Sequence, residues 1–244
     1  MRTQRAPHEL RPITITRNYT KYAEGSVLIA MGETIVLCNA TVQKTVPRFL
    51  IGKDSGWVTA EYSMLPRATD VRNRRESQQG RPSGRTMEIQ RLIGRSLRSI
   101  IDLHAMSGYT ITIDCDVLQA DGGTRCASVN GAFIALADAV DSMLAAGMIS
   151  ESPLRSTVAA ISVGIFNNWP LADLDYLEDS QAMVDMNVVA TGKGEFVEIQ
   201  GTGESRPFSR KDHDILLELA LDGIGQISAL QFEQLSAQIR QHLE

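Results

Sequence analysis

The chain has 244 residues, of which 43% are hydrophobic and 22% charged, and its formal net charge is −5. This length and composition are those of a globular protein with a sizeable core, and they exclude a low-complexity or wholly disordered chain. Residues 1–16 lack the apolar segment of a secretory signal, and no apolar run approaches the ~20 residues that cross a bilayer. Cys38, Cys115 and Cys126 show no CxxC spacing. We therefore expect reduced thiols, a cytoplasmic protein and no membrane partner.

The net charge hides an asymmetry along the chain. Residues 1–100 carry 17 Lys and Arg against 8 Asp and Glu, whereas residues 101–244 carry 7 against 21. Much of the positive charge lies in residues 66–99 and is nearly all arginine, which suits bidentate contacts with phosphate groups. A charge run is commonly a solvated surface, and that alternative stays open. The uneven distribution of charge between the two parts of the chain favours a site for a polyanion beside a site built of carboxylates.

Short segments rich in β-branched residues open the chain. They predict strands over residues 11–16, 25–32, 34–42 and 56–63. Residues 66–84 then form a loop with two prolines, two glycines and no periodicity, long enough to bind a ligand or to be disordered without one. Apolar residues at three- to four-residue spacing predict a helix over residues 86–102, with Arg85 at its start.

The next elements meet at the sequence "ADGGTR". Alternation predicts a strand over residues 109–119, and an apolar stripe predicts a helix over 124–146. Two adjacent glycines allow a close backbone approach, and a helix beginning at Thr124 would direct its first N–H groups at the turn. With the Thr124 hydroxyl and the Arg125 guanidinium these groups describe a phosphate pocket. The alternative is a plain joint with Thr124 as N-cap and Arg125 in solvent, and this stretch alone does not decide between them.

The second part of the chain repeats the same order of elements. Two helices, near residues 209–222 and 226–243, are predicted to follow strands over 157–166, 169–177, 182–192 and 195–204. Two similar layers of mostly antiparallel strands with paired helices indicate an α+β fold with an internal pseudo-repeat. Because no proline- or glycine-rich linker lies near residue 150, we predict one domain over residues 1–244, with halves of about 1–147 and 157–244.

Arg85 and Arg125 each stand at the start of a predicted helix beside a glycine. A cation is disfavoured at a helix N-terminus, so each guanidinium needs an anion nearby. Two such arginines on neighbouring helices would hold one phosphate from two directions. Solvent-facing arginines are the alternative.

Carboxylates crowd residues 173–189, which are predicted to form one hairpin: Asp173, Asp175, Glu178, Asp179 and Asp185. Such crowding is costly unless a cation or an arginine neutralises the charge. Oxygen ligands without a His or Cys set favour Mg²⁺ or Mn²⁺ over zinc. For Asp173 and Asp175 a solvated turn is favoured, whereas for Asp179 and Asp185 a functional role is favoured.

The other polar residues give weaker indications of function. The four histidines share no spacing with a nucleophile, and Asp114 and Asp116 are assigned structural roles although they could face the same cleft. Cys126 has no evident base and is expected to pack in the core. The residues together indicate phosphoryl chemistry on RNA or DNA, with phosphate as a reactant.

Six segments carry many of these residues in one order: "GWVTAEYSMLPRAT", "GRTMEIQRLIGRSLR", "IDCDVLQADGGTR", "AAISVGI", "EDSQAMVDMNVV" and "EIQGTGE". From about residue 9 to 230 the chain resembles the ribonuclease PH family of bacterial phosphorolytic exoribonucleases. The resemblance implies a ribosomal protein S5 domain 2-like α+β fold and a ring-shaped homo-hexamer, a trimer of dimers. It also implies 3′→5′ trimming of tRNA precursors, in which inorganic phosphate releases nucleoside diphosphates, and a reverse reaction that adds nucleotides.

The resemblance also assigns roles to individual residues. Gly123, Thr124 and Arg125, together with Arg85, would hold the attacking inorganic phosphate. Asp179 and Asp185 would be the catalytic carboxylates that position Mg²⁺, or Mn²⁺, and Asp185 or a water it orients would assist proton transfer to the departing 3′ oxygen. Six arginines are candidates to track the RNA backbone or to close a dimer face: Arg67, Arg72, Arg74, Arg75, Arg91 and Arg95.

The chain departs from the family pattern at a few positions. Cys126 stands where Thr is usual, Met183 stands where Glu is usual, and residues 166–169 form a slightly longer segment than is common. Loss of the glutamate would weaken metal binding. A non-catalytic RNA-binding ring subunit is one alternative, although such subunits tend to lose the arginines and aspartates kept here. A metal-dependent hydrolytic exonuclease is another, but hydrolysis needs no phosphate pocket.

Overall fold

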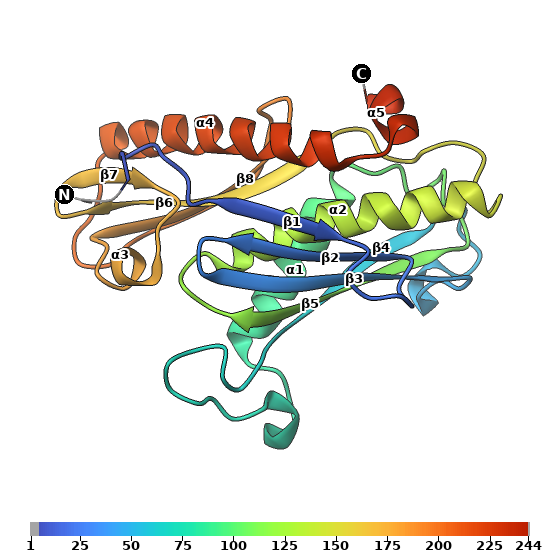
Figure 1. Ribbon diagram of the computed structural model, residues 1–244, viewed down its shortest axis with the longest axis horizontal. Coiled ribbons are helices and arrows are strands. Elements are labelled where there is room, and N and C mark those ends of the chain that lie inside the picture. Colours follow the sequence, from blue (N-terminus) through green and yellow to red (C-terminus); the bar gives the residue numbers. More distant parts are fainter. Residues whose placement is uncertain (1–4, 244) are drawn as a thin grey trace.

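The computed structural model describes residues 5–243, apart from the side chain of Gln79; residues 1–4 and 244, which the predicted domain includes, lie outside this part. Two sheets, of five and four strands, pack with helices around a shared hydrophobic core (Figure 1). The predicted α+β fold class is therefore confirmed. Short 3₁₀ helices, η1 (Arg48–Leu50) and η2 (Glu76–Gln79), lie in the loops around β4.

The first sheet has the strand order β1-β2-β3-β5-β4. Neighbouring strands are antiparallel except β4 and β5, which are parallel because the long connection through α1 returns the chain to the same end of the sheet. The predicted strands of this half are all present. They are β1 (Ile13–Arg17), β2 (Gly25–Met31), β3 (Thr34–Gln43), β4 (Trp57–Met64) and β5 (Thr110–Gln119).

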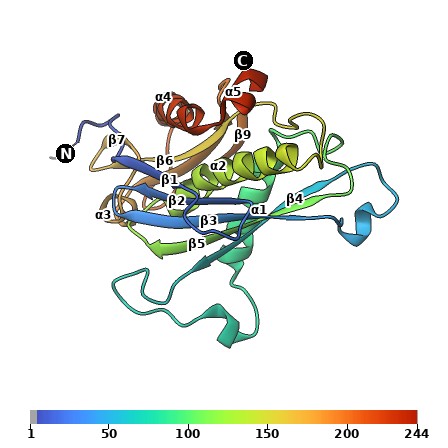
Figure 2. The ribbon, with the colours of Figure 1, turned by 45° about the vertical axis from the view of Figure 1, so that its right-hand side comes forward.

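Two helices cover the inner face of this sheet. α1 (Gly84–Arg98) buries its apolar stripe against β4, and α2 (Thr124–Ala145) packs on β2, β3 and β5. α2 also contacts β6 of the second sheet, so it is buried on nearly every side and lies between the two sheets (Figures 1 and 2). The start of α2 is thereby brought against the second half of the chain.

Asn130 of α2 hydrogen-bonds to backbone groups of β6 that no neighbouring strand pairs. Because β7 pairs with β6 only from Val163 onward, Ala160 has no strand neighbour on that side. The Asn130 amide takes the place of a strand: its Oδ1 accepts from the Ala160 N–H at 2.8 Å and its Nδ2 donates to the Ala160 carbonyl at 3.0 Å. Both backbone groups are thus satisfied, as burial requires.

The second sheet is antiparallel, with the order β7-β6-β8-β9. The predicted strand over 169–177 is too long: Asp173 adopts φ 51° and turns the chain, and Asp175 caps a short helix. The predicted acidic hairpin is therefore a helix followed by a strand. The elements are β6 (Val158–Phe166), β7 (Trp169–Ala172), α3 (Tyr176–Ser180), β8 (Val184–Thr191) and β9 (Phe196–Gly203).

The C-terminal helices differ from the prediction of a break near residues 223–225. α4 (Arg210–Gln234) runs unbroken through Gly223 and Gly225 and packs on β6, β7 and β8, and α5 (Ala237–Leu243) follows it. A Cβ on Gly223 would lie 2.4 Å from Ile161 Cδ1 of β6. Gly223 therefore serves close packing of helix on sheet rather than helix termination.

Within the described residues, α2 and α4 are long and apolar enough to cross a membrane, judged by length and composition alone. This differs from the expectation that no apolar run reaches that size. The apolar window of α2 is 83% buried inside the protein, as in a core helix, whereas that of α4 is 39% buried.

Candidate active site

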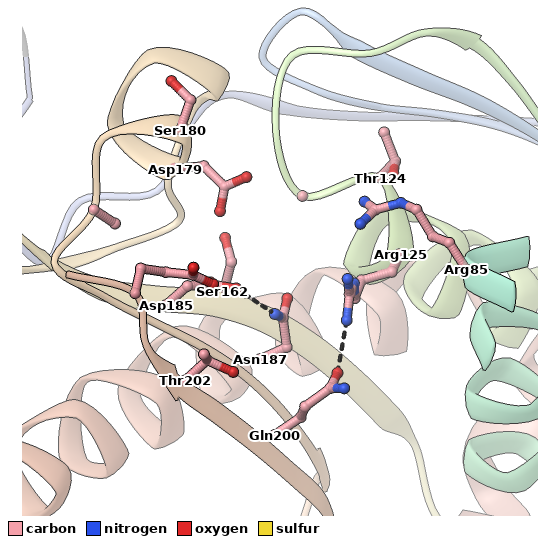
Figure 3. Close-up of a pocket in the computed structure, with 13 residues that line it drawn as sticks. Arg85, Thr124, Arg125, Ser162, Asp179, Ser180, Asp185, Asn187, Gln200 and Thr202 are labelled. Atoms are coloured by element: carbon pink, nitrogen blue, oxygen red, sulfur yellow. Dashed lines mark hydrogen bonds between the residues drawn. The ribbon is translucent and has the colours of Figure 1, made fainter. Parts of the chain in front are cut away.

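A cavity of about 400 Å³ lies where the start of α2 faces α3 and β8. Figure 3 shows two arginines on one side of it and two aspartates on the other. We call the first group the basic wall (Arg85, Gly123, Thr124 and Arg125) and the second the acidic wall (Asp179 and Asp185). The remaining lining residues are Ser162, Ser180, Ala182, Asn187, Gln200, Thr202 and Glu204. The structure thus brings together every residue predicted for phosphate and metal binding.

The basic wall begins with a helix N-terminus that has no side-chain cap. Gly122 and Gly123 adopt φ 75° and 66°, and Gly123, rather than Thr124, is the N-cap of α2. The left-handed backbone explains why glycine stands at both positions. Since glycine has no side chain to accept from the first N–H groups, these groups and the positive end of the helix dipole are available to an anion in the cavity.

Arg125 lines the cavity and contacts two polar side chains. Its Nη1 donates to Gln200 Oε1 of β9 at 2.6 Å and lies 3.5 Å from Glu88 Oε1 of α1, and Gln200 Nε2 donates to the same Glu88 oxygen at 2.8 Å. The sequence predicts that a bound anion offsets the charge of this arginine. In the structure Glu88 supplies part of that negative charge instead.

Arg85 differs from Arg125 because its guanidinium makes no hydrogen bond or ion pair with any residue that the structure describes. It is exposed in the first turn of α1 and lines the cavity opposite the acidic wall (Figure 3). A free guanidinium at a helix start is electrostatically disfavoured unless an anion joins it. Arg85 therefore gives the clearest indication of an anionic ligand.

Tyr62 of β4 is a further residue of the site that sequence reasoning missed. Its hydroxyl lies 2.9 Å from Thr124 Oγ1, and burial raises the pKa of the phenol, which therefore stays protonated. Tyr62 stands in the segment "AEYS", and Gln200 stands in "EIQGTGE". Both segments carried the resemblance, but nothing in a single sequence indicates that Gln200 lines this cavity or that Tyr62 contacts Thr124 behind it.

The acidic wall depends on the local capping of α3. Asp175 caps the helix by accepting from the Glu178 N–H at 2.9 Å, while Glu178 Oε2 accepts from the Asp175 N–H at 3.1 Å. This capping box holds the single turn on which Asp179 stands. Asp185 comes from β8, where it is paired in register with Gly164 and Thr202.

Asp185 is the most perturbed carboxyl of the cavity. Burial, and then the neighbouring Asp179, raise its pKa to about 6. Its Oδ2 accepts from Asn187 Nδ2 at 3.3 Å, whereas its buried Oδ1 has no partner among the described residues. Burial also raises the pKa of Asp179, and Arg125 and Arg85 oppose that rise.

The donor set fits a hard divalent cation such as Mg²⁺ only with help from outside the protein. No group of three or more His, Cys, Asp or Glu side chains suited to a metal occurs within residues 5–243. Two carboxylates are nevertheless the kind of set that Mg²⁺ uses when water and substrate phosphate complete its shell. The unpartnered Asp185 Oδ1 is the atom that such a cation would satisfy.

Cys126 and Met183, two of the positions that depart from the family pattern, make contacts that the structure describes. Cys126 is buried, which raises its pKa to about 12, and its Sγ donates to Asn187 Oδ1 at 3.4 Å. The predicted packing role is confirmed, because such a thiol is no nucleophile at neutral pH. The Met183 carbonyl accepts from the Glu204 N–H at 3.0 Å, and this contact brings the Glu204 carboxylate to the cavity.

Asp173 does not lie in the solvated turn favoured for it. It is 1% exposed and binds Arg11 through both carboxylate oxygens, while Asp175 is the α3 cap already described. The capping role of Asp175 follows from the sequence of a short helix, but the Arg11 partner comes from 162 positions earlier in the chain. That partnership depends on the fold.

The remaining candidates lie outside the cavity. Asp114 and Asp116 alternate with buried neighbours and face away from the core, where burial and then Glu61 raise their pKa. Arg91 and Arg95 line an adjoining groove of about 420 Å³ between α1 and β9. Arg67, Arg72, Arg74 and Arg75 are exposed on the loop that projects away from both sheets (Figures 1 and 2).

The chain is similar to solved exosome proteins. Rice (Oryza sativa) Rrp46 is 23% identical, with 93% of this chain and 96% of that chain covered and a TM-score of 0.75. The Archaeoglobus fulgidus exosome with RNA bound to the active site is 22% identical, with 93% of this chain and 90% of that chain covered and a TM-score of 0.79. An archaeal exosome core is 21% identical, with 94% of this chain and 89% of that chain covered and a TM-score of 0.73. At these identities the likeness shows a shared fold.

Two sequence models of one family match nearly the whole chain. Domain 1 of the RNase PH 3′ exoribonuclease family matches residues 9–140, and domain 2 of the same family matches residues 156–234. Both matched segments contribute to the cavity, the first through the basic wall and the second through the acidic wall. The chain belongs to the RNase PH 3′ exoribonuclease family.

Proposed function

We propose that the protein is a ribonuclease PH, a phosphate-dependent 3′→5′ exoribonuclease that trims the 3′ ends of tRNA precursors. One observation carries the proposal: a single cavity holds two arginines and an uncapped helix start opposite two aspartates. Family membership supports an RNA 3′ end as substrate. A hydrolase attacks with water and has no use for such a binding place for free phosphate.

The reaction follows from the placing of charge. Inorganic phosphate binds Arg85, Arg125, the Thr124 hydroxyl and the first N–H groups of α2. One of its oxygens attacks the phosphorus of the last phosphodiester, the bond to the 3′ oxygen breaks, and a nucleoside diphosphate leaves. Two anions must meet for this step, so charge neutralisation and positioning supply most of the rate. The reverse reaction adds a nucleotide and releases phosphate.

The acidic wall serves the leaving side of the reaction. Asp179 and Asp185 would hold Mg²⁺, or Mn²⁺, which supplies stabilisation of the charge that builds on the transferred phosphoryl group. The unpartnered Asp185 Oδ1 supports this placing. The departing 3′ oxygen takes its proton from Asp185 or from a water that Asp185 orients.

The wider assembly belongs to the same proposal. Six copies form a ring, a trimer of dimers, in the cytoplasm and without a membrane partner, and the loop arginines with Arg91 and Arg95 contact RNA or close the dimer face. The exposure of these arginines and the exosome complexes among the solved structures of similar fold support RNA binding and assembly.

The test uses a short single-stranded RNA and Mg²⁺, with and without inorganic phosphate, and identifies the released mononucleotides. Nucleoside diphosphates that appear only with phosphate are the expected result. Monophosphates released without phosphate would replace phosphorolysis by hydrolysis.

Variants then locate the phosphate. Arg85→Ala and Arg125→Ala should each raise the KM for phosphate about 100-fold, because the reacting anion loses one charged donor. Arg91→Ala, between one and two turns further along α1 and outside the cavity, should leave that KM unchanged. RNA affinity should change little in the first two variants, and equal loss of RNA binding in both would count against the assignment.

A second candidate is a non-catalytic ring subunit that binds RNA. The exosome assemblies among the solved structures of similar fold favour a ring subunit, although one of them has RNA bound to its active site. Absence of any mononucleotide release from a well-folded, RNA-binding preparation would support this candidate over phosphorolysis.

A further inference from the structure

The turn that leads into the basic wall contains two adjacent glycines, the residue type whose backbone is least restricted in conformation. Gly122 and Gly123 both adopt left-handed backbone angles, and glycine restricts its own conformation less than any other residue. Yet the N–H groups that follow must keep one direction if they are to bind an anion. Something outside the turn has to fix it.

Arg11, in the segment before β1, lies behind this turn and is 6% exposed. Its Nη1 donates to the Asp121 carbonyl at 2.6 Å and reaches the Gly122 carbonyl at 3.5 Å. Thr34 Oγ1 also donates to the Gly122 carbonyl, at 2.6 Å. A Cβ on Gly123 would lie 3.1 Å from Arg11 Nη2, so the guanidinium packs directly against the N-cap of α2.

The same guanidinium also holds the segment that leads to the acidic wall. Arg11 Nε and Nη2 donate to the two oxygens of Asp173 at 3.1 and 2.7 Å, and the Arg11 backbone N–H donates to Asp173 Oδ2 at 2.7 Å. Asp173 lies two residues before the α3 cap. One planar group is therefore bonded to the backbone of the basic wall and to the base of the acidic wall.

We propose that Arg11 is a positioning residue that sets the separation and orientation of the two walls of the cavity. The inference rests on the proposed function, because the separation matters only if phosphate on one wall must meet a phosphodiester held at the other. A planar fork with five donors fixes such an angle, which an ammonium group cannot do. Displacement of a bound reactant by about 1 Å can lower a rate 100-fold.

A matched control lies one strand away. Arg17 of β1 also binds an aspartate, Asp138 of α2, through Nε and Nη2, and its Nη1 donates to the Gln234 carbonyl at 2.6 Å. Arg17 thus repeats the chemistry of Arg11, an arginine on a carboxylate plus a carbonyl. Neither arginine lines the cavity, but the partners of Arg17 lie away from both walls, whereas those of Arg11 adjoin them. Removing either arginine should destabilise the fold, because a buried carboxylate loses its guanidinium hydrogen bonds. Asp173 keeps the Arg11 backbone N–H and Arg5, whose Nη1 lies 3.6 Å from Asp173 Oδ2.

The experiment compares Arg11→Gln, Arg11→Lys and Arg17→Gln at a temperature where circular dichroism shows each to be folded. Both Gln variants should lower the Tm. Only the Arg11 variants should raise the KM for phosphate and the Kd from calorimetric titration with inorganic phosphate, by about 10-fold or more. Arg11→Lys keeps the charge but not the fork, so it should recover part of the Tm and little of the phosphate affinity.

The outcomes separate the inference from the proposed function. An Arg11→Gln protein that binds phosphate as tightly as Arg17→Gln would overturn the positioning role, whatever the activity. Failure of the wild-type protein to release diphosphates would instead overturn the function, while the titration would still decide the role of Arg11. If Arg11→Gln does not fold, Thr34→Val takes its place in the experiment, because it removes the second donor to the Gly122 carbonyl. Unchanged phosphate affinity in both Thr34→Val and Arg11→Lys would refute the proposal.

Discussion

Thr124 depends on Tyr62, a residue 3% exposed whose hydroxyl lies 2.9 Å away. A hydroxyl carries one proton, so the direction of this bond decides what Thr124 can offer to a ligand. Because Thr124 Oγ1 is the partner that the structure gives the buried phenol, the phenol is suited to donate its proton there. The proton of Thr124 is then free for an anion in the cavity.

We expect Tyr62→Phe to keep the fold and to raise the KM for phosphate about 3- to 10-fold, the effect of one hydrogen bond of about 1 kcal/mol. Tyr109→Phe, at the opposite end of β5 from the cavity, is the control and should not change that KM. Steady-state kinetics at varied phosphate measure both. An unchanged KM in Tyr62→Phe would mean that Thr124 orients itself.

The raised pKa of Asp185 implies that its negative charge lowers the stability of the folded protein. Its folded-state pKa, about 6, lies above the ordinary value of about 3.9, so stability is lost as pH rises from about 4 to about 6 and stays lost above that range. Asp185→Asn removes the charge and should increase the free energy of unfolding by about 1–3 kcal/mol at pH 8 while abolishing turnover.

Denaturant unfolding in the presence of a chelator measures this change. The gain over wild type should shrink toward pH 4, where the folded carboxyl is already protonated. A gain independent of pH would show that shape rather than charge is responsible.

At the scale of elements, α4 shows how packing overrides propensity. A helix with glycines at two positions so close together is weak in isolation, which is why the sequence predicts a break near 223–225. The two glycines nevertheless differ: a Cβ on Gly223 would meet Ile161 of β6 at 2.4 Å, whereas a Cβ on Gly225 would meet nothing within 4 Å. Only Gly223 has a structural reason to be glycine.

Gly225→Ala should therefore stabilise the protein by about 0.5–1 kcal/mol, because alanine favours the helix and clashes with nothing. Gly223→Ala should destabilise it by about 1–3 kcal/mol through overpacking against β6. Thermal unfolding of the two variants gives a matched comparison on one helix. Equal effects would contradict the packing argument.

The sequence predicts best what is local. Period-2 and period-3.6 patterns locate every strand of the first sheet and the helices α1 and α2, and the glycine turn with Thr124 and Arg125 marks the basic wall. Contacts that join distant segments leave no such pattern. The sequence favours a solvated turn for Asp173 because its partner Arg11 is unrecognisable before the fold is known, and the same holds for Gln200 beside Arg125.

At the scale of the whole molecule, positive charge lies in two places to which the proposed function gives different roles. Arg85 and Arg125 line the cavity, whereas Arg72, Arg74 and Arg75 are exposed on the projecting loop. A cavity that binds phosphate needs charge at short range, and a long RNA needs charge along its path. The two sets should therefore be separable by mutation.

We expect the triple variant with Arg72, Arg74 and Arg75 changed to Gln to bind single-stranded RNA more weakly at low salt. Every RNA phosphate that is no longer neutralised should reduce the slope of log K against log salt by about 0.7, so the whole change is about 2. Titrations at several salt concentrations measure it, and the KM for phosphate should stay unchanged. If the loop closes a dimer face instead, light scattering will show a smaller assembly and the slope will not move.

The order of the two cavity walls along the chain has a consequence for protein synthesis. The ribosome makes Arg85 and Arg125 first, and Asp179 and Asp185 follow only with α3 and β8. A nascent chain can thus assemble its first sheet and the start of α2 before the acidic wall has been synthesised. Under the proposed function, an unfinished enzyme cannot degrade the ribosomal RNA that surrounds it while it is being made.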